Sequence, residues 1–298
     1  MGSHGRRWVT YDVPQVAALL RGEKVVHAFH PTTKNVVNAV RNYGLARRVF
    51  KEHAVDRVIS TGAAVAVPFM IRARQLGISC HYIESATRVT GPSLSGRIVA
   101  RLPGVHLYRQ MGDWGAPHWR PGPCVFDEFR VSSAEDAGGE LQEAGPPRRV
   151  FVSLGTHHFP FTALVERLRG LAAPDIHLVW QLGATPPPAG GLPGRVVGQL
   201  AADEFRREIE DADVVVGHAG VGLTLTSLSA GKVPVLVPRR RARREHTDDH
   251  QVQLARALQH RGLAVAAGVG ELSLEQLAQA ARRTVVHVEP PPFHLVTE

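Results

Sequence analysis

Short apolar runs alternate with longer amphipathic runs through the first 110 residues of the chain. The apolar runs are rich in Val and Ile, and the runs between them repeat apolar residues at helical spacing. This pattern predicts strands at 6–12, 24–31, 56–62, 78–85 and 104–110, and helices at 13–22, 35–53, 64–77 and 93–102. Strands and helices that alternate in this way indicate a parallel sheet covered on both faces.

A second series of the same kind begins near residue 148. It predicts strands at 148–156, 176–183, 195–200, 213–220, 233–238 and 263–267, and helices near 160–172, 202–211, 221–230, 247–261 and 273–284. Between the two series, residues 112–149 are rich in Gly, Pro, Ser and acidic residues and show no convincing period. We therefore predict an α/β protein with two doubly wound, Rossmann-like domains at 1–130 and 148–298, which face a cleft and are joined by a linker at 131–147.

The composition is that of an ordinary globular protein, with 44% hydrophobic and 21% charged residues in a chain of 298. Only Cys80 and Cys124 are present, so the sequence implies no disulfide framework and fits a reducing compartment. No apolar run approaches the roughly 20 residues that cross a bilayer, and the N-terminus lacks the apolar stretch of a signal peptide. We expect a cytoplasmic protein, either free or at the inner face of the cell membrane.

The net charge of +8 is compatible with nucleic acid, an anionic membrane or a phosphate-bearing substrate, and equally with an arginine-rich composition alone. No zinc-finger spacing, RNA-binding signature or interleaving of basic and aromatic residues supports a nucleic-acid partner. We therefore predict that the protein has no such partner. Steeply salt-dependent binding to DNA or RNA would contradict this prediction.

Two glycine turns are candidates for binding phosphate. The stretch VVVGHAGVGLTLT (214–226) predicts a buried strand that enters a helix directly, and the first turn of such a helix attracts anions through its unpaired N–H groups and its dipole. A second turn of this kind follows the strand VFVSL. The candidate residues are Gly155, Thr156, His218, Ala219, Gly220, Val221 and Gly222. Packing alone explains either turn equally well, but the two together can hold a pyrophosphate.

A polar segment, PRRRARREHTDDHQVQLARAL (238–258), follows the next predicted strand and ends in a helix that Thr247 or Asp248 can cap. Its polar side chains lie where they can bind the hydroxyl groups of a sugar. They are Glu245, His246, Asp248, Asp249, His250 and Gln251. Alternatively, the aspartates only favour the helix N-terminus, and the five arginines at 239–244 form a solvated loop. We predict no metal site, because His246 and His250 lack a clear third ligand.

Several stretches of the chain resemble known glycosyltransferases. VFVSLGTHHFPFTALVERL, ADVVVGHAGVGLTLTSLSAGKVPVLVPRR and EHTDDHQVQLARAL together resemble the C-terminal half of family 28, and most closely the donor-binding subunit of Alg13 type and its bacterial exopolysaccharide relatives. VISTGAAVAVPFMIRARQLGISCHYIESATRVTGPSLSGRIVARL is similar to the acceptor-side partner of Alg14 type. The chain thus looks like a fusion of the two subunits, and the resemblance covers about residues 6–110 and 148–270.

The resemblance implies an enzyme of the GT-B fold that moves a sugar from a UDP-sugar to a lipid-pyrophosphate-linked acceptor, with inversion. It places the diphosphate at Gly155-Thr156 and at the turn after His218, and the sugar and ribose near Thr226 and residues 249–251. Such enzymes need no bound metal, because main-chain donors and a helix dipole stabilise the leaving group. A hexose, a hexuronic acid and N-acetylglucosamine all remain candidates, and the run of arginines makes glucuronic acid one of them.

The chain departs from the family pattern at two places. Family members begin with a strand and a Gly-Gly-His turn, whereas this chain enters directly what resembles the second strand, and no strand precedes His4. We therefore predict that the first βα unit is missing, either truly or because translation starts further upstream, and that a sheet edge is open. Thr226 stands where many relatives have a glutamate that contacts ribose, although the exopolysaccharide branch often lacks it.

The reaction also needs a general base that deprotonates the acceptor hydroxyl. Glu84 in YIES is the predicted base, because it ends a strand that faces the cleft. Capping of the next segment or pairing with Arg88 explains this residue equally well. His27 and His30 flank the end of another strand and are weaker candidates, since most such histidines have surface or packing roles.

The predicted helix at 35–53 combines basic and apolar residues. It either lies on a membrane surface, beside a lipid-linked acceptor, or simply covers the sheet. Its basic residues, together with the lysine just before it, are Lys34, Arg41, Arg47, Arg48 and Lys51.

Two other functions stay open for the chain. One is a degenerate subunit that binds a UDP-sugar without transferring it, and the other is a transferase of N-acetylglucosamine that makes a lipid-linked, chitobiose-like disaccharide.

Overall fold

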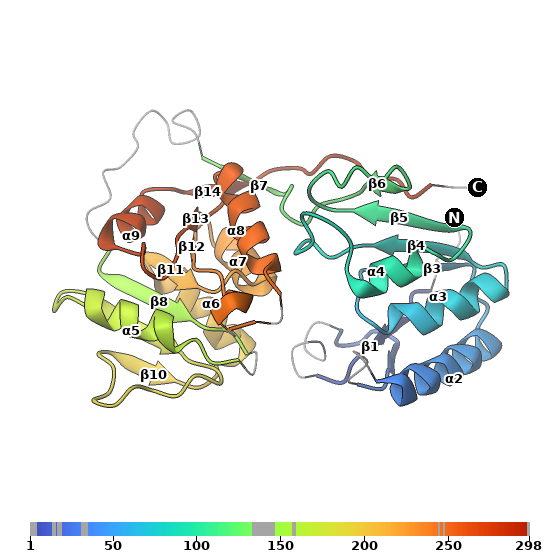
Figure 1. The fold of residues 1–298 in the computed structure, drawn as a ribbon, viewed down its shortest axis with the longest axis horizontal. Helices are drawn as coiled ribbons and strands as arrows, with labels where there is room; N and C mark the ends of the chain where they lie inside the picture. Colours follow the sequence, from blue (N-terminus) through green and yellow to red (C-terminus); the bar gives the residue numbers. More distant parts are fainter. Residues whose placement is uncertain are drawn as a thin grey trace. The chain divides into compact units, whose positions relative to one another are not determined.

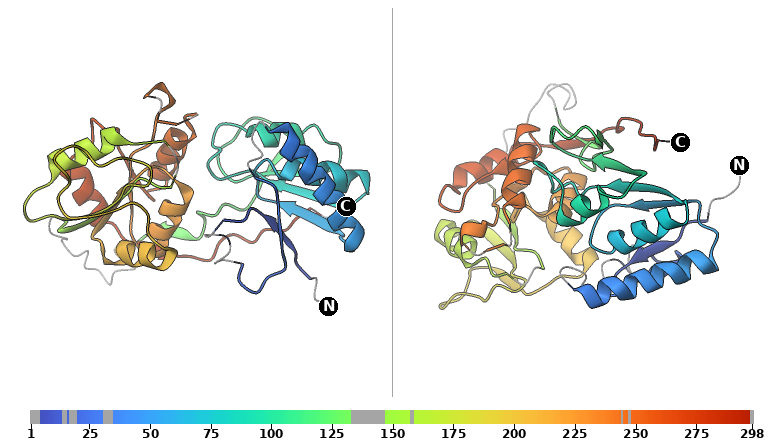
Figure 2. Two further views of the ribbon diagram at one scale, coloured as in Figure 1. Left: turned by 90° about the horizontal axis from the view of Figure 1, so that it is seen from below. Right: turned by 45° about the vertical axis from the view of Figure 1, so that its right-hand side comes forward.

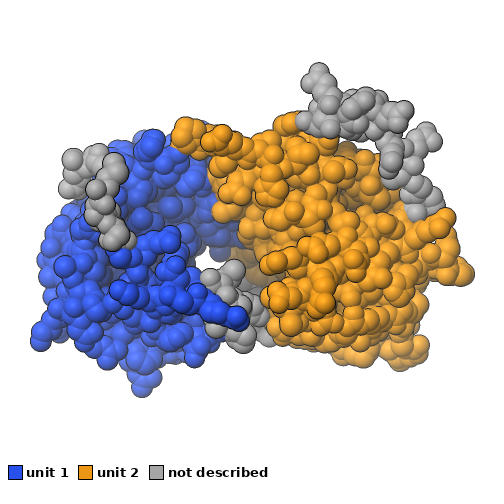
Figure 3. All heavy atoms as spheres, turned by 180° about the vertical axis from the view of Figure 1, so that it is seen from behind, with its two compact units in different colours: residues 1–123, 293–298 blue, residues 124–292 orange. Residues whose placement is uncertain are grey.

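The chain divides into two compact units, which Figure 3 shows in different colours. Unit 1 comprises residues 1–123 with 293–298, and unit 2 comprises residues 124–292. The computed structural model describes residues 5–13, 16, 20–30, 35–132, 147–156, 159–243, 245–246 and 248–296. The predicted linker and the predicted helix at 13–22 lie largely outside the described residues. His4, Lys34 and the predicted cap Thr247 lie wholly outside them.

The boundary between the units lies earlier in the chain than the sequence predicts. Strand β7 (Phe129–Val131) pairs antiparallel with β14 (Val285–His287), which belongs to unit 2. The guanidinium of Arg261 donates to the carbonyl of Phe126 at 3.0 Å and to the carboxylate of Asp127 at 2.9 Å. These contacts with distant parts of the sequence attach the segment to unit 2 rather than to the first domain or a linker.

The last described residues belong to unit 1, although the sequence places them in the second domain. Phe293 packs edge-on against Tyr108, with 5.3 Å between the ring centroids. The N–H of Val296 donates to the hydroxyl of Tyr108 at 3.1 Å. A buried tyrosine of strand β5 (Val105–Arg109) thus fixes the C-terminal segment on unit 1.

Unit 1 contains two parallel sheets where the sequence predicts one. Strands β1 (Trp8–Thr10) and β2 (Val25–His27) pair with each other. The second sheet has the order β3 (Arg57–Ser60), β4 (Ser79–Ile83), β5 and β6 (Trp119–Pro121). Among the described strands β1 and β3 share no ladder, so each is an edge strand, and Ile59 on β3 is 53% exposed. The sequence predicts an open sheet edge in this unit, and β3 has one among the described strands.

The described helices of unit 1 lie next to one another in chain order and pack against its strands (Figures 1 and 2). They are α2 (Val36–Glu52), α3 (Ala66–Gln75) and α4 (Leu94–Val99). One face of α2 packs into a core through the buried residues Leu45, Ala46 and Val49. Its N-terminal end instead exposes Val36, Val37 and Val40, and the outer face continues with exposed basic residues. No helix in the described part of the chain is long and apolar enough to span a membrane.

Unit 2 is built on a parallel sheet of six strands in the order β10-β9-β8-β11-β12-β13. The strands are β8 (Arg149–Ser153), β9 (His177–Gln181), β10 (Arg195–Val197), β11 (Val214–Gly217), β12 (Val235–Leu236) and β13 (Val265–Ala266). The helices are α5 (Thr162–Leu171), α6 (Ala202–Asp211), α7 (Val221–Ser229), α8 (His250–His260) and α9 (Leu274–Ala281). Figures 1 and 2 show α6 and α7 on one face of the sheet and α5, α8 and α9 on the other, which confirms the predicted α/β fold.

Alternate residues of the strands fill the space under α6 and α7. Phe151, Val179 and Val215 come from three neighbouring strands and pack with Ile209 and Leu223 of the helices. Because the strands are buried on both faces, their sequences are almost continuously apolar. That is the pattern from which the sequence predicts them.

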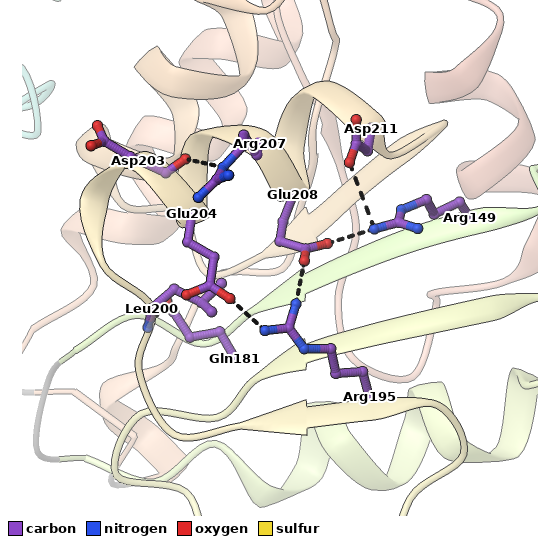
Figure 4. A network of polar contacts seen from close by, with 9 residues as sticks. All are labelled: Arg149, Gln181, Arg195, Leu200, Asp203, Glu204, Arg207, Glu208 and Asp211. Carbon is purple, nitrogen blue, oxygen red and sulfur yellow. Dashed lines mark hydrogen bonds and ion pairs between the residues drawn. The ribbon is translucent and has the colours of Figure 1, made fainter.

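A network of ion pairs joins α6 to the sheet (Figure 4). The side chain of Glu208 is only 8% exposed and pairs with Arg149 of β8 at 2.8 Å and with Arg195 of β10. Arg195 also pairs with Glu204, one turn earlier on the helix. One largely buried carboxylate thus connects two strands and fixes the position of α6 on them.

Candidate functional site

The two predicted phosphate-binding turns lie side by side at one edge of the sheet in unit 2. Strands β8 and β11 are adjacent and parallel, with Ser153 level with Gly217. Gly155 follows the first strand and His218 the second, so both turns leave the sheet at its carboxyl edge. The chain builds outward in opposite directions from these two strands, and ligands of open α/β sheets bind at such a reversal. The two turns are therefore placed to act on one ligand.

The imidazole of His218 fills the space between the turns. A Cβ atom on Gly155 would lie 2.5 Å from Cε1 of this ring, and one on Gly220 would lie 2.4 Å from Nε2. Gly155 also has a φ of +76°, which residues with a side chain rarely adopt. Close packing against His218 is thus sufficient to require glycine at both positions. A third glycine, Gly183 after β9, packs onto the carbonyl of Gly155 and was not singled out from the sequence.

Helix α7 begins at this turn without a side-chain cap. Its N-cap is Gly220, and its first turn contains no acidic residue. The first N–H groups and the positive end of the helix dipole are therefore not compensated by side chains of the helix. Gly222 in the first turn is exposed, and a Cβ there would meet nothing within 4 Å. This end of α7 can attract an anion.

Three other predicted donor-binding residues belong to the same turns. Ala219 is 1% exposed and is part of the core. Thr156 is exposed at the end of the first turn, and Val221 opens α7. Thr226 lies one turn further along the helix, where its hydroxyl donates to the carbonyl of Gly222 at 2.9 Å. Its predicted contact with a ribose stays a prediction.

The polar segment after β12 is folded back by hydrogen bonds to its own arginine run. Three backbone N–H groups each donate at 3.0 Å to one side chain: Arg239 to Gln251, Arg240 to Glu245 and Arg241 to Asp249. Gln251 and Glu245 are buried in these contacts, whereas Asp249 stays exposed. Two of the predicted sugar-binding residues thus shape the loop, and Asp249 remains open to a ligand on its exposed side.

Arg239 has a structural role that the sequence did not predict. It is 1% exposed, and its guanidinium donates to the carbonyls of Leu154, Phe159 and Pro160 at 2.7 to 3.0 Å. It also lies over the ring of Phe161, 4.7 Å from the centroid. Burial lowers its pKa to about 10, so it stays charged at neutral pH. The reading of the arginine run as solvated is wrong for this residue, which ties the polar segment to the loop after β8.

The remaining polar residues of the segment, His246, Asp248 and His250, lie together. His246 Nδ1 is 3.4 Å from Asp248 Oδ1, and His250 Nδ1 contacts the same oxygen. The two imidazoles meet edge to face, with 4.7 Å between their centroids. The sequence showed no clear third ligand beside the two histidines. In the structure, a carboxylate oxygen of Asp248 lies close enough to both imidazoles to be a possible third ligand.

Glu84 ends β4, but its carboxylate is buried and bonded. Oε2 accepts from the N–H and the hydroxyl of Ser93, both at 2.9 Å, and Oε1 accepts from the N–H of Ser85 at 3.0 Å. Ser93 is the N-cap of α4, and a Cβ on Gly96 would collide with the same carboxylate. The structure therefore favours the capping role of Glu84 over the role of a general base.

His27 is better placed for proton transfer. It is the last residue of β2, its side chain is 54% exposed, and its Nδ1 lies 4.0 Å from a carboxylate oxygen of Asp12. His30, by contrast, packs edge-on against Tyr11 with 4.7 Å between the ring centroids. At 4.0 Å the imidazole of His27 is not hydrogen-bonded to this carboxylate, but its exposure makes it accessible to a substrate hydroxyl.

The STGA stretch of unit 1 forms a third strand-to-helix turn. Gly62 and Ala63 have φ values of +115° and +62°, and α3 follows with no side-chain cap. The hydroxyl of Tyr82 is fully buried near Glu84 and Ser93, and a Cβ on Gly62 would lie 3.9 Å from it. Burial, and then the nearby charge of Glu84, raise the pKa of Tyr82, so the hydroxyl keeps its proton.

Sequence comparison agrees with the site in unit 2. Residues 150–286 match the model of the glycosyltransferase family 28 C-terminal domain. The match runs from β8 to β14 and includes both glycine turns and the polar segment. The family 28 match thus covers the predicted donor side of the chain. No curated protein matches the chain.

Solved structures share the fold of most of the chain. The crystal structure of MurG from Acinetobacter baumannii is 20% identical, with a TM-score of 0.56 over 92% of this chain and 80% of MurG. The glycotransferase of kitacinnamycin is 18% identical, with a TM-score of 0.60 over 92% of this chain and 81% of its own. S. aureus MnaA, solved with UDP, is 9% identical, with a TM-score of 0.52 over 87% of this chain and 72% of its own. These likenesses establish the fold, which is the predicted GT-B fold.

Proposed function

We propose that the chain is an inverting glycosyltransferase that moves a sugar from a UDP-sugar to a saccharide linked to polyprenyl pyrophosphate. The observation that best supports it is the meeting of two glycine turns with the uncapped end of α7, in the region that matches family 28. The structure of MnaA with UDP adds that a protein of similar fold has been solved with this nucleotide. The setting we propose is exopolysaccharide or glycolipid synthesis.

In the proposed donor site the diphosphate lies against the turns after β8 and β11, beside the imidazole of His218 that fills the space between them. The N–H groups that open α7 donate to the phosphate oxygens, and the imidazole of His218 lies against both turns to donate beside them. These donors are fixed before the reaction, so they stabilise the charge that develops on the leaving UDP. Transfer by this route needs no bound metal.

Sugar selection falls to the polar segment after β12. Asp249 is exposed there, and the side chains of Arg240, Arg241 and Arg243 are exposed as well. A carboxylate accepts from sugar hydroxyls, while a guanidinium binds a carboxylate through paired hydrogen bonds. The donor sugar is thus a hexose, N-acetylglucosamine or a hexuronic acid, and the arginines favour the last.

We assign deprotonation of the acceptor hydroxyl to His27, and the nearby carboxylate of Asp12 favours the imidazolium that this step forms. Glu84 is buried under α4 and bonded to Ser93, whereas His27 is open to an acceptor. The turn at Gly62, after which α3 begins without a side-chain cap, provides main-chain donors for the pyrophosphate of the carrier lipid. The general base is thus a residue that the sequence ranked below Glu84.

The exposed end of α2 fits a carrier that lies in a membrane. Val36, Val37 and Val40 are 76%, 61% and 65% exposed, and Arg41 and Lys51 lie on exposed positions of the same helix. Exposed apolar residues beside basic ones bind the surface of anionic bilayers. Sedimentation with anionic vesicles should therefore weaken when the three valines are changed to Ser, but not when Val196 and Leu274 of unit 2, which are 41% and 45% exposed, are changed.

A transfer assay tests the proposed reaction. Labelled UDP-glucose, UDP-glucuronic acid and UDP-GlcNAc are offered with saccharides on polyprenyl pyrophosphate, in EDTA, and lipid-linked label and released UDP are measured. One donor should give both products in equal amounts. Binding of UDP without any turnover would instead support the degenerate subunit, which the divided sheet of unit 1 favours as the second candidate.

A further inference from the structure

We propose that His246, Asp248 and His250 form a binding site for a divalent transition-metal ion of the zinc class. One possible ligand atom from each of these side chains lies within 4.8 Å of the other two. Two imidazole nitrogens and one carboxylate oxygen are a ligand set that proteins use for such ions, with further coordination positions left for water or another oxygen ligand.

The geometry is close to what an ion requires. An ion bound at about 2.1 Å keeps its ligand atoms roughly 3–4 Å apart. The 3.4 Å between His246 Nδ1 and Asp248 Oδ1 lies in this range, and His250 Nδ1 contacts the same oxygen. Small rotations of the side chains therefore suffice to bring the three atoms around one ion.

The segment that carries these ligands is held in place by its neighbours. Glu245 accepts the N–H of Arg240, and Asp249 accepts the N–H of Arg241, so residues on either side of Asp248 are tied to the arginine run. The side chains of His246 and His250 are 9% and 16% exposed, and that of Asp248 is 36% exposed. The cluster is thus pre-organised and mostly covered, with one side open to a further ligand.

The same contacts also fit a cluster that binds no ion, in which the N–H of Asp248 donates to His246 Nδ1 at 3.4 Å and the carboxylate of Asp248 is bonded to His250 Nδ1. The exposed Arg240, Arg241 and Arg243 add positive charge to the segment, and Glu245 and Asp249 oppose it. The proposed donor site uses main-chain groups and no metal. The proposed metal site is therefore independent of the donor site. Metal titration separates the two arrangements.

The test is a titration of the full chain with Co²⁺ after treatment with EDTA and its removal. We expect visible absorption that saturates at one Co²⁺ per chain and is displaced by Zn²⁺. Asp248→Asn and His250→Gln should each weaken binding at least about tenfold, because even the loss of an outer-shell partner of a metal site costs that much. His260→Gln changes an exposed histidine at the other end of α8 and should leave the affinity unchanged.

Absence of the absorption, or equal affinity in the wild type and Asp248→Asn, would overturn the metal site. Melting curves without metal establish that each variant is folded, and a given concentration of Zn²⁺ should raise the melting temperature of the wild type and of His260→Gln more than that of Asp248→Asn and His250→Gln. Calorimetry with UDP in EDTA on the same samples reports on the donor site separately. Failure of one claim is therefore not mistaken for failure of the other.

Discussion

The ring of His218 explains two glycines that a phosphate site would also require. A phosphate that approaches the backbone and a ring that packs onto it both exclude a Cβ atom, so both require glycine at that position of the sequence. The glycines of both turns could thus be predicted as positions of close approach. Which neighbour makes that approach depends on the rotamer of one histidine, and the sequence does not contain it.

This packing can be tested by pairing two substitutions. Gly220→Ala places a Cβ where the ring of His218 stands and should lower the free energy of unfolding by about 2 kcal/mol, as overpacking does. In a His218→Ala background the ring is gone, and the same substitution should cost much less. Urea denaturation of the four proteins measures this coupling, and an equal cost in both backgrounds would show that the ring does not constrain the turn.

Glu84 and His27 should respond to substitution in different ways. Glu84→Ala leaves the N–H of Ser93 without its acceptor and should lower the free energy of unfolding by about 1–3 kcal/mol. His27→Asn keeps a polar side chain at an exposed position and should leave stability unchanged, while the transfer rate falls about 10²–10⁴-fold. Thermal melts and initial rates measure both effects. A stable Glu84→Gln variant without transfer, beside an active His27→Asn, would return the role of base to Glu84.

At the scale of elements, the buried strands and long helices could be predicted, and three short strands could not. β8 is apolar between its two terminal residues and β11 along its whole length, so their own sequences predict them. β6, β7 and β14 are three residues each, and among the described strands β7 pairs only with β14, far along the chain. Such strands depend on a partner that local periodicity does not reveal.

The contact between α6 and the sheet should depend on one carboxylate. Glu208→Gln removes the charge that pairs with Arg149 and Arg195, and it should lower the free energy of unfolding by about 1–2 kcal/mol. Glu210→Gln changes an exposed residue of the same helix and should have little effect. Urea denaturation at neutral pH compares the two. Similar losses would mean that net charge, and not the bridge across the strands, stabilises the helix.

At the scale of the whole molecule, the alternation of strands and helices was enough to predict two α/β units, and the family resemblance predicted that they form a GT-B fold. The boundaries of the units could not be predicted from the sequence. The segment after residue 124 belongs to unit 2 through a contact with Arg261, and the segment after residue 293 belongs to unit 1 through a contact with Tyr108, and both partners are remote in the sequence. The first sheet is divided, because β1 and β3 share no ladder among the described strands, and the family pattern predicted an open edge. Periodicity thus predicts the strands and helices of each unit, whereas contacts between residues distant in sequence determine where each unit begins and ends.

Binding of UDP, ADP and GDP to the wild type, Gly222→Ala and Gly222→Asp, measured by calorimetry, tests the donor site most directly. A Cβ at this position meets nothing within 4 Å, and an aspartate in the first turn of α7 favours the helix dipole, so neither variant should melt below the wild type. We predict UDP-selective binding by the wild type and Gly222→Ala, and an affinity at least about tenfold weaker in Gly222→Asp, because its carboxylate repels the diphosphate. Unchanged UDP affinity in Gly222→Asp, or no UDP binding by the wild type, would contradict a diphosphate site at this turn.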